Sequence, residues 1–357
     1  VAAAQSSSTD PPDPDHPTLK EAQDSPEWDS LWCPAVQDEM DNLHEHDVAD
    51  EVKYKDIPPD AVIYPTKMDL KKKRDTCGIF TKAKARLVVI GNFVQNLFKS
   101  LFAPTVNERS VKLIFILSII FGLLVTGIDV KGAFLYPTQP EEVYVSLPPR
   151  ITGGSKRYWK LKKTLYGLSD SPRRFYDDCS TLLLENGYTR TIADPCMFYR
   201  HVGKEYILLV VHVDDFVIAS SSKKLTRELL VLMKSRYTIT VQESVEDFIG
   251  LHIEHLSDGS ILLSQPHQIQ KLASDYQLLE VPSPTVPMSS LFNDEYQNDA
   301  PKADIEQYMR LLGRLLFVIK TRPDIAYAVN RLATRTNCAT TRDFKALLRV
   351  VSYLYGT

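Results

Sequence analysis

The chain alternates between two hydrophobic periods, which predict helices in some stretches and strands in others. Apolar side chains at helical spacing predict helices near 32–43, 107–121, 173–186, 223–236, 303–320, 323–336 and 341–354. Short apolar runs predict strands near 85–90, 123–130, 158–165, 206–213 and 216–220, with further strands within 246–264. This mixture predicts an α+β fold.

Two stretches lack this periodicity. Residues 1–27 are rich in Ser, Asp and Pro, which predicts a disordered linker. Residues 281–302 are rich in Pro and Ser, which predicts a loop between helices. The chain begins at Val1 instead of Met, so we expect it to be a fragment of a longer protein.

Three carboxylates stand at the ends of predicted strands. Asp129 ends one apolar strand, and Asp214 and Asp215 form the bend between two others. An antiparallel sheet could place the three side by side, where divalent cations would relieve their repulsion. Two Mg²⁺ ions held in this way can activate a hydroxyl and neutralise a leaving pyrophosphate. A plainer alternative is that Asp214 and Asp215 merely favour a turn.

Charge is distributed unevenly around these carboxylates. The net charge is −3, yet residues 1–60 carry 16 acidic and 3 basic side chains, which leaves 39 basic and 29 acidic ones for the rest. The basic residues concentrate in 67–86, 156–174 and 310–349. Each cluster alone is typical of a solvated face, but three of them around one acidic centre favour a groove that follows a nucleic-acid backbone.

Cysteine spacing and hydropathy exclude other classes of protein. The five cysteines lie far apart without a CxxC pair, so neither a zinc site nor a disulfide framework is indicated, and we expect a reducing intracellular setting. The most apolar stretch, 113–125, has 13 residues, fewer than the roughly 20 that cross a bilayer. We therefore expect it to be buried core, and we expect no membrane partner.

An ordered series of short motifs runs through the chain. They are KARLV at 84–88, FAP at 102–104, DVKGAFL at 129–135, LYGL at 165–168, SPR at 171–173, DPC at 194–196, VDD at 213–215, FIG at 248–250, TRPDI at 321–325 and YLYGT at 353–357. Each is weakly specific, but the ordered set closely resembles the reverse transcriptase of copia-type long-terminal-repeat retrotransposons. The resemblance covers about Trp28 to the end.

The resemblance implies a right-hand polymerase fold with fingers, an antiparallel-sheet palm and a helical thumb and connection. The implied parts are fingers and the start of the palm at 28–128, the palm with the catalytic aspartates at 129–245, the primer grip and thumb at 246–300, and a connection at 301–357 that precedes a ribonuclease H domain absent from this chain. The implied setting is the cytoplasm, within retrotransposon particles.

The resemblance also implies an RNA-directed DNA polymerase, which is a nucleotidyltransferase. Asp129, Asp214 and Asp215, together with the backbone carbonyl of Val130, would hold two Mg²⁺ ions, with Mn²⁺ as a possible substitute. The implied partners are an RNA or DNA template with a DNA primer, and deoxynucleoside triphosphates. The oligomeric state is left open.

Five residues match the family's nucleotide-binding positions. Lys84 and Arg86 match the fingers strand whose cations approach the incoming triphosphate, although a solvated strand face is the alternative. Phe134 falls at the aromatic gate that collides with a ribose 2′ hydroxyl, although core packing is the alternative. Tyr166 and Gly167 fall in the loop beneath the template and nucleotide.

Phe248, Ile249 and Gly250 resemble the primer grip, which holds the primer terminus, although such a triplet is common in cores. Three departures from the family pattern concern efficiency. His212 replaces Tyr or Phe, Ser169-Asp170 replaces Lys-Gln, and 91–102 lacks the usual Asp-Tyr. Two alternatives therefore stay open: a decayed or fragmentary retroelement product that folds and binds nucleic acid without polymerising, and a metal-dependent nuclease or nucleotide cyclase on a similar palm.

Overall fold

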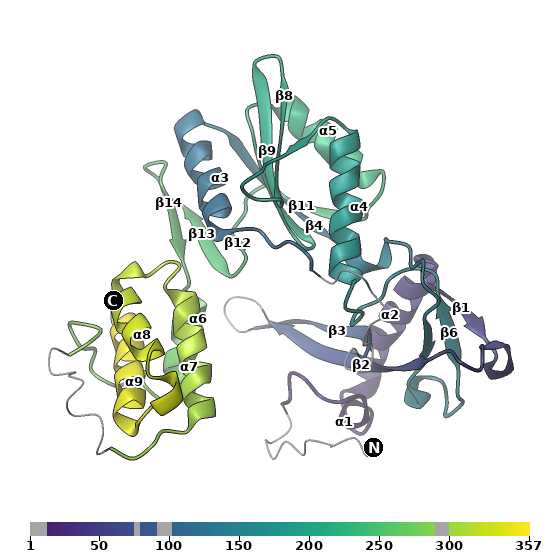
Figure 1. The fold of residues 1–357 in the computed structure, drawn as a ribbon, viewed down its shortest axis with the longest axis horizontal. Helices are drawn as coiled ribbons and strands as arrows, with labels where there is room; N and C mark the ends of the chain where they lie inside the picture. Colours follow the sequence, from purple (N-terminus) through teal and green to yellow (C-terminus); the bar gives the residue numbers. More distant parts are fainter. Residues whose placement is uncertain (1–12, 75–78, 91–101, 290–299) are drawn as a thin grey trace. The chain divides into compact units, whose positions relative to one another are not determined.

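The structure, a computed structural model, describes residues 13–74, 79–90, 102–289 and 300–357. The chain divides into two compact units, Val1–Ser244 and Val245–Thr357. Each unit combines helices with a β-sheet (Figure 1), so the predicted mixture of helices and strands is present.

The centre of the first unit is a six-stranded antiparallel sheet. In spatial order its strands are β11 (Ile239–Gln242), β4 (Leu124–Val130), β10 (Asp215–Ser220), β9 (Glu205–His212), β8 (Met197–Val202) and β7 (Thr189–Arg190). The apolar runs of the sequence predict β4, β9 and β10 to within a few residues of these bounds. β9 and β10 are apolar on both faces because helices cover both sides of the sheet (Figure 1).

Three helices provide that cover. α4 (Ser171–Glu185) and α5 (Lys223–Lys234) share one core with the sheet, in which Phe175 and Leu229 contact the side of the sheet that carries Phe216. α3 (Glu108–Phe121) lies against β9 and β10 from the opposite face (Figure 1). The sheet is thus held between helices, with β11 and β7 as its edge strands.

A five-stranded sheet forms the other part of the first unit. Its strands, in spatial order, are β1 (Ala49–Val52), β6 (Tyr158–Leu161), β5 (Tyr144–Ser146), β2 (Ile63–Arg74) and β3 (Phe80–Val89), and only β2 and β5 are parallel. The long antiparallel pair β2–β3 carries most of the basic cluster 67–86, and residues 75–78 of its turn lie outside the described part. α2 (Cys33–Glu45) packs on this sheet through the apolar stripe that the sequence predicts.

Short helical turns connect these elements. They are the π-helical turn η1 (Trp28–Trp32) and the 3₁₀ turns η2 (Tyr54–Asp56), η4 (Ala133–Leu135) and η5 (Pro149–Ile151). η4 follows β4 directly and carries Phe134. The step from strand to turn occurs at Gly132, whose φ of 63° lies in the left-handed region that glycine adopts without a steric penalty.

The N-terminal segment corrects one prediction. Residues 13–27 are not a disordered linker: they include α1 (Leu19–Gln23), which begins with a capping box between Thr18 and Glu21. Ala22 is fully buried, and the Arg74 guanidinium pairs with Asp15 at 2.7 Å. Contacts with the first unit therefore order a segment whose composition alone predicts disorder, while residues 1–12 lie outside the described part.

The second unit joins a small sheet to a helical bundle. The antiparallel strands are β12 (Asp247–Phe248), β13 (Leu251–His255) and β14 (Ile261–Ser264). The helices are α6 (Pro266–Asp275), α7 (Ile305–Val318), α8 (Ala326–Ala333) and α9 (Thr341–Tyr355), with the 3₁₀ turns η7 (Pro323–Ile325) and η8 (Thr336–Cys338). The three predicted terminal helices correspond to α7, α8 and α9, and all four helices contribute to one apolar core.

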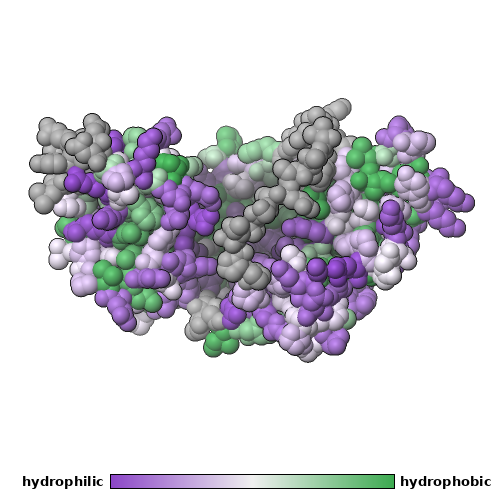
Figure 2. Space-filling view, turned by 90° about the horizontal axis from the view of Figure 1, so that it is seen from below, coloured by the Kyte–Doolittle hydropathy of each residue, from purple (hydrophilic) through white to green (hydrophobic). Residues whose placement is uncertain are grey.

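The apolar stretch 113–125 runs from the middle of α3 into the start of β4. The prediction that it is buried core is wrong for much of it, because α3 buries Ile114 and Phe115 but exposes Ile116, Ile120 and Phe121. No helix in the described part of the chain is long and apolar enough to span a bilayer. On the face shown in Figure 2, hydrophobic residues form small groups among polar ones.

Candidate active site

A tight turn places two of the three candidate carboxylates. His212 at the end of β9 pairs in register with Asp215 at the start of β10, so Val213 and Asp214 form the turn between them. Val213 has a φ of 55°, a conformation that β-branched residues rarely adopt. Such backbone strain costs on the order of 1–3 kcal/mol, which the strands on either side must offset.

The third carboxylate lies on the neighbouring strand. β4 and β10 are antiparallel, and Asp129 is the register partner of Asp215. The Val130 N–H donates to the Asp214 carbonyl at 2.8 Å, which continues the pairing beyond the two aspartates. Side chains at directly opposed positions of an antiparallel pair have Cβ atoms roughly 4.5–5.5 Å apart. The structure therefore brings together the acidic residues that the sequence places far apart.

Their proximity perturbs the ionisation of Asp215. Burial and the negative charges of Asp214 and Asp129 together raise the pKa of its carboxyl to about 6, against the opposing effect of Lys73. The carboxylates thus repel one another across a partly desolvated space. A bound cation would relieve that repulsion.

The chemistry of this donor set suits a hard divalent cation, since carboxylate oxygens are the ligands that Mg²⁺ prefers. Within the residues that the structure describes, no three His, Cys, Asp or Glu side chains are grouped closely enough to form a metal site. The fit of Asp129, Asp214 and Asp215 to Mg²⁺ therefore rests on their oxygen chemistry and their shared repulsion.

A cavity of about 840 Å³ lies beside the aspartates. Its walls come from α2, the β2–β3 hairpin, the chain from β4 into η4, and the β9–β10 turn. The predicted site residues in its lining are Lys84, Arg86, Asp129, Val130, Phe134, Tyr166 and Asp214. One cavity thus has carboxylates on one wall and cations on another.

Five charged residues that the sequence analysis did not assign to the site also line this cavity: Asp38, Glu39, Lys73, Lys82 and Lys131. Glu39 stands on the apolar face of α2 and is only 7% exposed. A carboxylate within an apolar helical stripe was the available sequence signal for Glu39. Lys73 and Lys82 belong to the basic cluster 67–86 that the sequence analysis singled out, whereas Lys131 offered no separate signal.

The two cations predicted to bind the nucleotide line the cavity from β3. Lys84 and Arg86 are two residues apart on one strand, so both lie on the same side. The Arg86 guanidinium lies over the Tyr166 ring, 5.2 Å from its centroid. Its Nε is buried and has no hydrogen-bond acceptor among the described residues, which leaves a donor for a ligand oxygen.

Lys84 stands in a strongly positive surrounding. Burial and the charges of Arg86, Lys73 and Lys82 together lower the pKa of its ammonium to about 8. The negative charge of Glu39 acts in the opposite direction. An anionic ligand beside Lys84 would offset the surrounding positive charge and favour the protonated ammonium.

Phe134 packs between the acidic and basic walls. Its ring meets the Tyr166 ring edge-on at a centroid distance of 5.6 Å, and its carbonyl accepts a hydrogen bond from the Thr164 hydroxyl. Phe134 is half-buried and still lines the cavity. It therefore combines the packing role with the cavity position that a gate requires.

Gly167 allows the loop after β6 to touch β3. Its φ is +87°, and a Cβ at this position would lie 2.1 Å from the Val89 carbonyl oxygen. The Val89 N–H donates to the Tyr166 carbonyl at 2.8 Å. The glycine is thus required for a backbone contact that holds Tyr166 in place.

The predicted primer-grip residues belong to the second unit. Phe248 is buried at the end of β12, while Ile249 and Gly250 form the turn into β13 with φ values of 48° and 77°. A Cβ on Gly250 would lie 2.8 Å from the Phe317 ring. These contacts account for a tight turn in the unit's own core, and the primer-grip role stays a prediction.

The acidic residues of 1–60 change the interpretation of the basic clusters. Several of them pair with cations from the rest of the first unit: Asp15 with Arg74, Glu27 with Lys72, Asp47 and Asp50 with Lys162, and Glu51 with Arg157. In the second unit, Arg310, Arg314 and Arg322 also have carboxylate partners. Much of the local positive charge is therefore neutralised within the protein, whereas Lys73, Lys82, Lys84 and Arg86 line the cavity.

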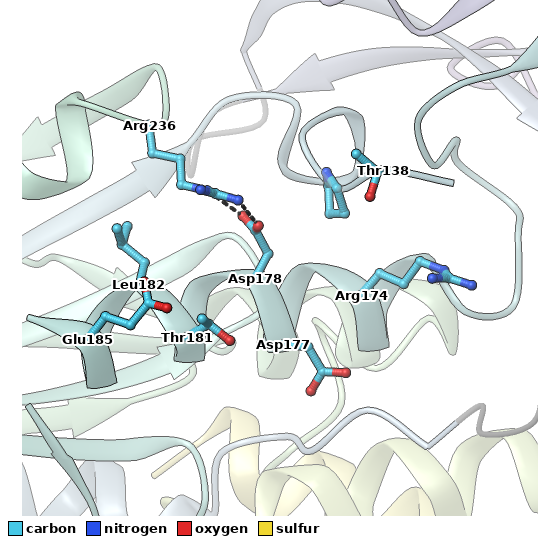
Figure 3. A pocket seen from close by; sticks show the side chains of 9 residues that line it. Thr138, Arg174, Asp177, Asp178, Thr181, Leu182, Glu185 and Arg236 are labelled. Atoms are coloured by element: carbon cyan, nitrogen blue, oxygen red, sulfur yellow. Dashed lines mark hydrogen bonds and ion pairs between the residues drawn. The ribbon is translucent and has the colours of Figure 1, made fainter. Parts of the chain in front are cut away.

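A smaller cavity of about 280 Å³ lies along α4 (Figure 3). Asp178 there pairs with Arg236 and accepts a hydrogen bond from the Tyr237 hydroxyl at 2.6 Å. Nearby, Arg174 pairs with Asp170, the buried residue that departs from the family pattern. The Asp178–Arg236 pair ties α4 to the segment after α5, and the Asp170–Arg174 pair joins the N-cap of α4 to its first turn, which gives Asp170 a structural role.

Comparison with known proteins identifies the class of the chain. Residues 51–290 match the reverse transcriptase (RNA-dependent DNA polymerase) family, and the chain belongs to that family. It is accordingly of the nucleotidyltransferase class, as an RNA-directed DNA polymerase domain.

The similar proteins are polyproteins of copia-type retrotransposons, which confirms the resemblance drawn from the motifs. The chain is 29% identical over 304 residues to the retrovirus-related Pol polyprotein from transposon RE2 of Arabidopsis thaliana, covering 84% of the chain and 21% of that protein. It is 26% identical over 355 residues to the one from transposon TNT 1-94 of Nicotiana tabacum, covering 95% of the chain and 26% of that protein. The chain thus spans about a fifth to a quarter of these relatives.

Proposed function

We propose that this chain extends a DNA primer on an RNA or DNA template, using deoxynucleoside triphosphates. The observation that carries the proposal is the register pairing of Asp129 with Asp215 beside a cavity whose other wall carries Lys84 and Arg86. Paired acidic and basic walls suit a triphosphate that is bound together with divalent cations. Membership of the reverse transcriptase family supports the same activity.

In this proposal the right-hand parts fall on the observed elements. The six-stranded sheet is the palm, β2 and β3 belong to the fingers, and the second unit supplies the thumb and connection. Asp129, Asp214 and Asp215, with the Val130 carbonyl, would hold two Mg²⁺ ions or Mn²⁺ in their place. When bound, the ions stabilise charge on the attacking 3′ oxygen and on the leaving pyrophosphate.

The side chains around the cavity bind and orient the nucleotide. Lys84 and Arg86 contact phosphate oxygens, and the unpartnered Arg86 Nε is a donor for one of them. Phe134 stands against the sugar, where its ring excludes a 2′ hydroxyl. Tyr166 and Gly167 support the template and nucleotide from below, and Phe248, Ile249 and Gly250 hold the primer terminus.

Primer extension tests the proposal directly. The purified chain is incubated with poly(rA), an oligo(dT) primer, dTTP and Mg²⁺, and is compared with its Asp214→Asn variant. We expect synthesis by the wild type and a fall to background in the variant, because the substitution removes one anionic ligand from the candidate metal site.

Asp60→Asn is the matched control, since Asp60 is an exposed carboxylate outside the cavity. Equal synthesis by wild type and Asp214→Asn would contradict the assigned role of the aspartate. Absence of synthesis by the wild type with either Mg²⁺ or Mn²⁺ would favour a product that binds nucleic acid without polymerising.

A further inference from the structure

β3 carries the two fingers cations, and it is an edge strand. It pairs only with β2 in the five-stranded sheet, so the backbone groups of alternate residues face away from that sheet. Two such groups find partners elsewhere: the Leu87 N–H donates to Glu39 Oε1 at 3.0 Å, and the Val89 N–H donates to the Tyr166 carbonyl at 2.8 Å. Glu39 and Tyr166 therefore hold the free edge of β3 immediately after Lys84 and Arg86.

The Glu39 carboxylate is costly to keep at this position. It is 7% exposed, and burial raises its pKa to about 6, while the Leu87 N–H and the charges of Lys84 and Arg86 act in the opposite direction. A glutamine oxygen could accept the same N–H without the cost of a buried charge. The hydrogen bond alone therefore does not account for a carboxylate.

The surrounding cations account for a carboxylate at position 39. Lys73, Lys82, Lys84 and Arg86 all line the cavity, and they repel one another when no anionic ligand is present. Glu39 is the carboxylate that acts on Lys84 against this repulsion. It balances part of the positive charge from the α2 side of the cavity.

We propose that Glu39 is a positioning residue for nucleotide binding: it fixes β3 against α2 and balances the charge of Lys84 and Arg86, so that both cations are in place before a triphosphate arrives. This inference rests on the proposed nucleotide-binding role of Lys84 and Arg86. It assigns to α2 a part in binding the nucleotide, although α2 carries none of the site residues that the sequence indicates.

The charge-balancing role has a pH signature. The charged groups with the largest effects on the Lys84 pKa are Arg86, Lys73 and Lys82, which disfavour the protonated ammonium, and Glu39, which favours it. Without the Glu39 charge the Lys84 pKa falls below about 8, so the cation is lost at a lower pH. Loss of nucleotide affinity with rising pH should therefore begin earlier in Glu39→Gln than in the wild type.

Equilibrium binding of dTTP tests the inference without requiring turnover. The full chain is bound to poly(rA) with a dideoxy-terminated oligo(dT) primer in Mg²⁺, and dTTP is titrated at pH values on both sides of 8. Glu39→Gln should weaken dTTP binding about tenfold, with a profile shifted to lower pH, while the affinity for the primer–template stays unchanged. Glu39→Ala, which also loses the hydrogen bond, should weaken dTTP binding further.

Glu45→Gln is the matched control, because it removes an exposed carboxylate from the same helix outside the cavity. Tryptophan fluorescence verifies that each variant is folded. Equal dTTP affinity and an equal pH profile in Glu39→Gln and wild type would overturn the inference. If the wild type binds dTTP but does not extend primers, the inference stands and the polymerase activity fails. If the wild type binds no dTTP, the proposed nucleotide site fails and the inference fails with it.

Discussion

Replacing Gly167 with alanine tests the contact that joins the Tyr166 loop to β3. The new Cβ would lie 2.1 Å from the Val89 oxygen and 2.8 Å from Val88 Cγ1, so the backbone must move and the hydrogen bond from Val89 to Tyr166 must lengthen or break. The positive φ costs alanine roughly 1–2 kcal/mol, and a lost backbone hydrogen bond costs roughly 1–3 kcal/mol.

Alanine also reduces the conformational entropy of the unfolded chain, which offsets about 0.4–1 kcal/mol of the lost unfolding free energy. The expected net loss of unfolding free energy is therefore about 2–4 kcal/mol. Gly203→Ala is the matched control, since Gly203 also has a positive φ, +62°, but no heavy atom lies within 4 Å of the position that a Cβ would occupy there. The Gly203→Ala variant should lose no more than about 1 kcal/mol of unfolding free energy, because its alanine has the unfavourable positive φ but no steric clash.

Urea unfolding followed by tryptophan fluorescence measures this difference. All three tryptophans, Trp28, Trp32 and Trp159, belong to the first unit, and the last two share a core with Val89. The signal therefore reports the part of the protein that contains Gly167. A Gly167→Ala variant that loses no more stability than Gly203→Ala would refute the close backbone contact.

Three further changes test the carboxylate hairpin and the gate. Asp215→Asn should abolish primer extension yet stabilise the first unit by about 1–2 kcal/mol at pH 8, because it removes a partly buried charge. The folded pKa of Asp215 is about 6 and its ordinary value is 3.8, so the wild type loses stability as the pH rises from 3.8 to 6. Urea midpoints should therefore be higher for the variant than for the wild type above this pH range, and equal below it. Val213→Gly should raise the unfolding free energy by about 1 kcal/mol in the same assay by relieving the positive φ, and a clear loss would argue against strain. Phe134→Ala should admit ribonucleotides, measured as the ratio of kcat/KM for UTP and dTTP, and an unchanged ratio would remove the gate assignment.

Local patterns were sufficient to predict the acidic half of the site. The apolar runs on both sides of Asp214 and Asp215 predicted a hairpin, and β9 and β10 form it. Asp129 ends another apolar run, so an antiparallel sheet left few positions for it other than a neighbouring strand. Only the register, with Asp129 opposite Asp215, required the structure.

Long-range contacts limited the rest of the prediction. The composition of residues 13–27 predicts disorder, yet Asp15 and Glu27 pair with Arg74 and Lys72 of β2. These partners are distant in sequence, so no local pattern reports them. The capping box at Thr18 and Glu21 was a local signal for α1, but so short a helix is unstable without such contacts.

Three unfavourable features converge on the cavity: the strained turn at Val213, the repelling carboxylates around Asp215, and the crowded cations around Lys84. A protein without a ligand gains nothing from any of them, since uncharged residues and a glycine turn would be more stable. The two electrostatic costs come from opposite charges. A single anion would relieve the repulsion among the cations but not that among the carboxylates, and a single cation would do the reverse. A nucleotide triphosphate with its divalent cations carries both complements, and binding it would stabilise the first unit in proportion to its affinity. The arrangement of opposed charges thus indicates the chemical class of ligand more directly than any one residue in the cavity.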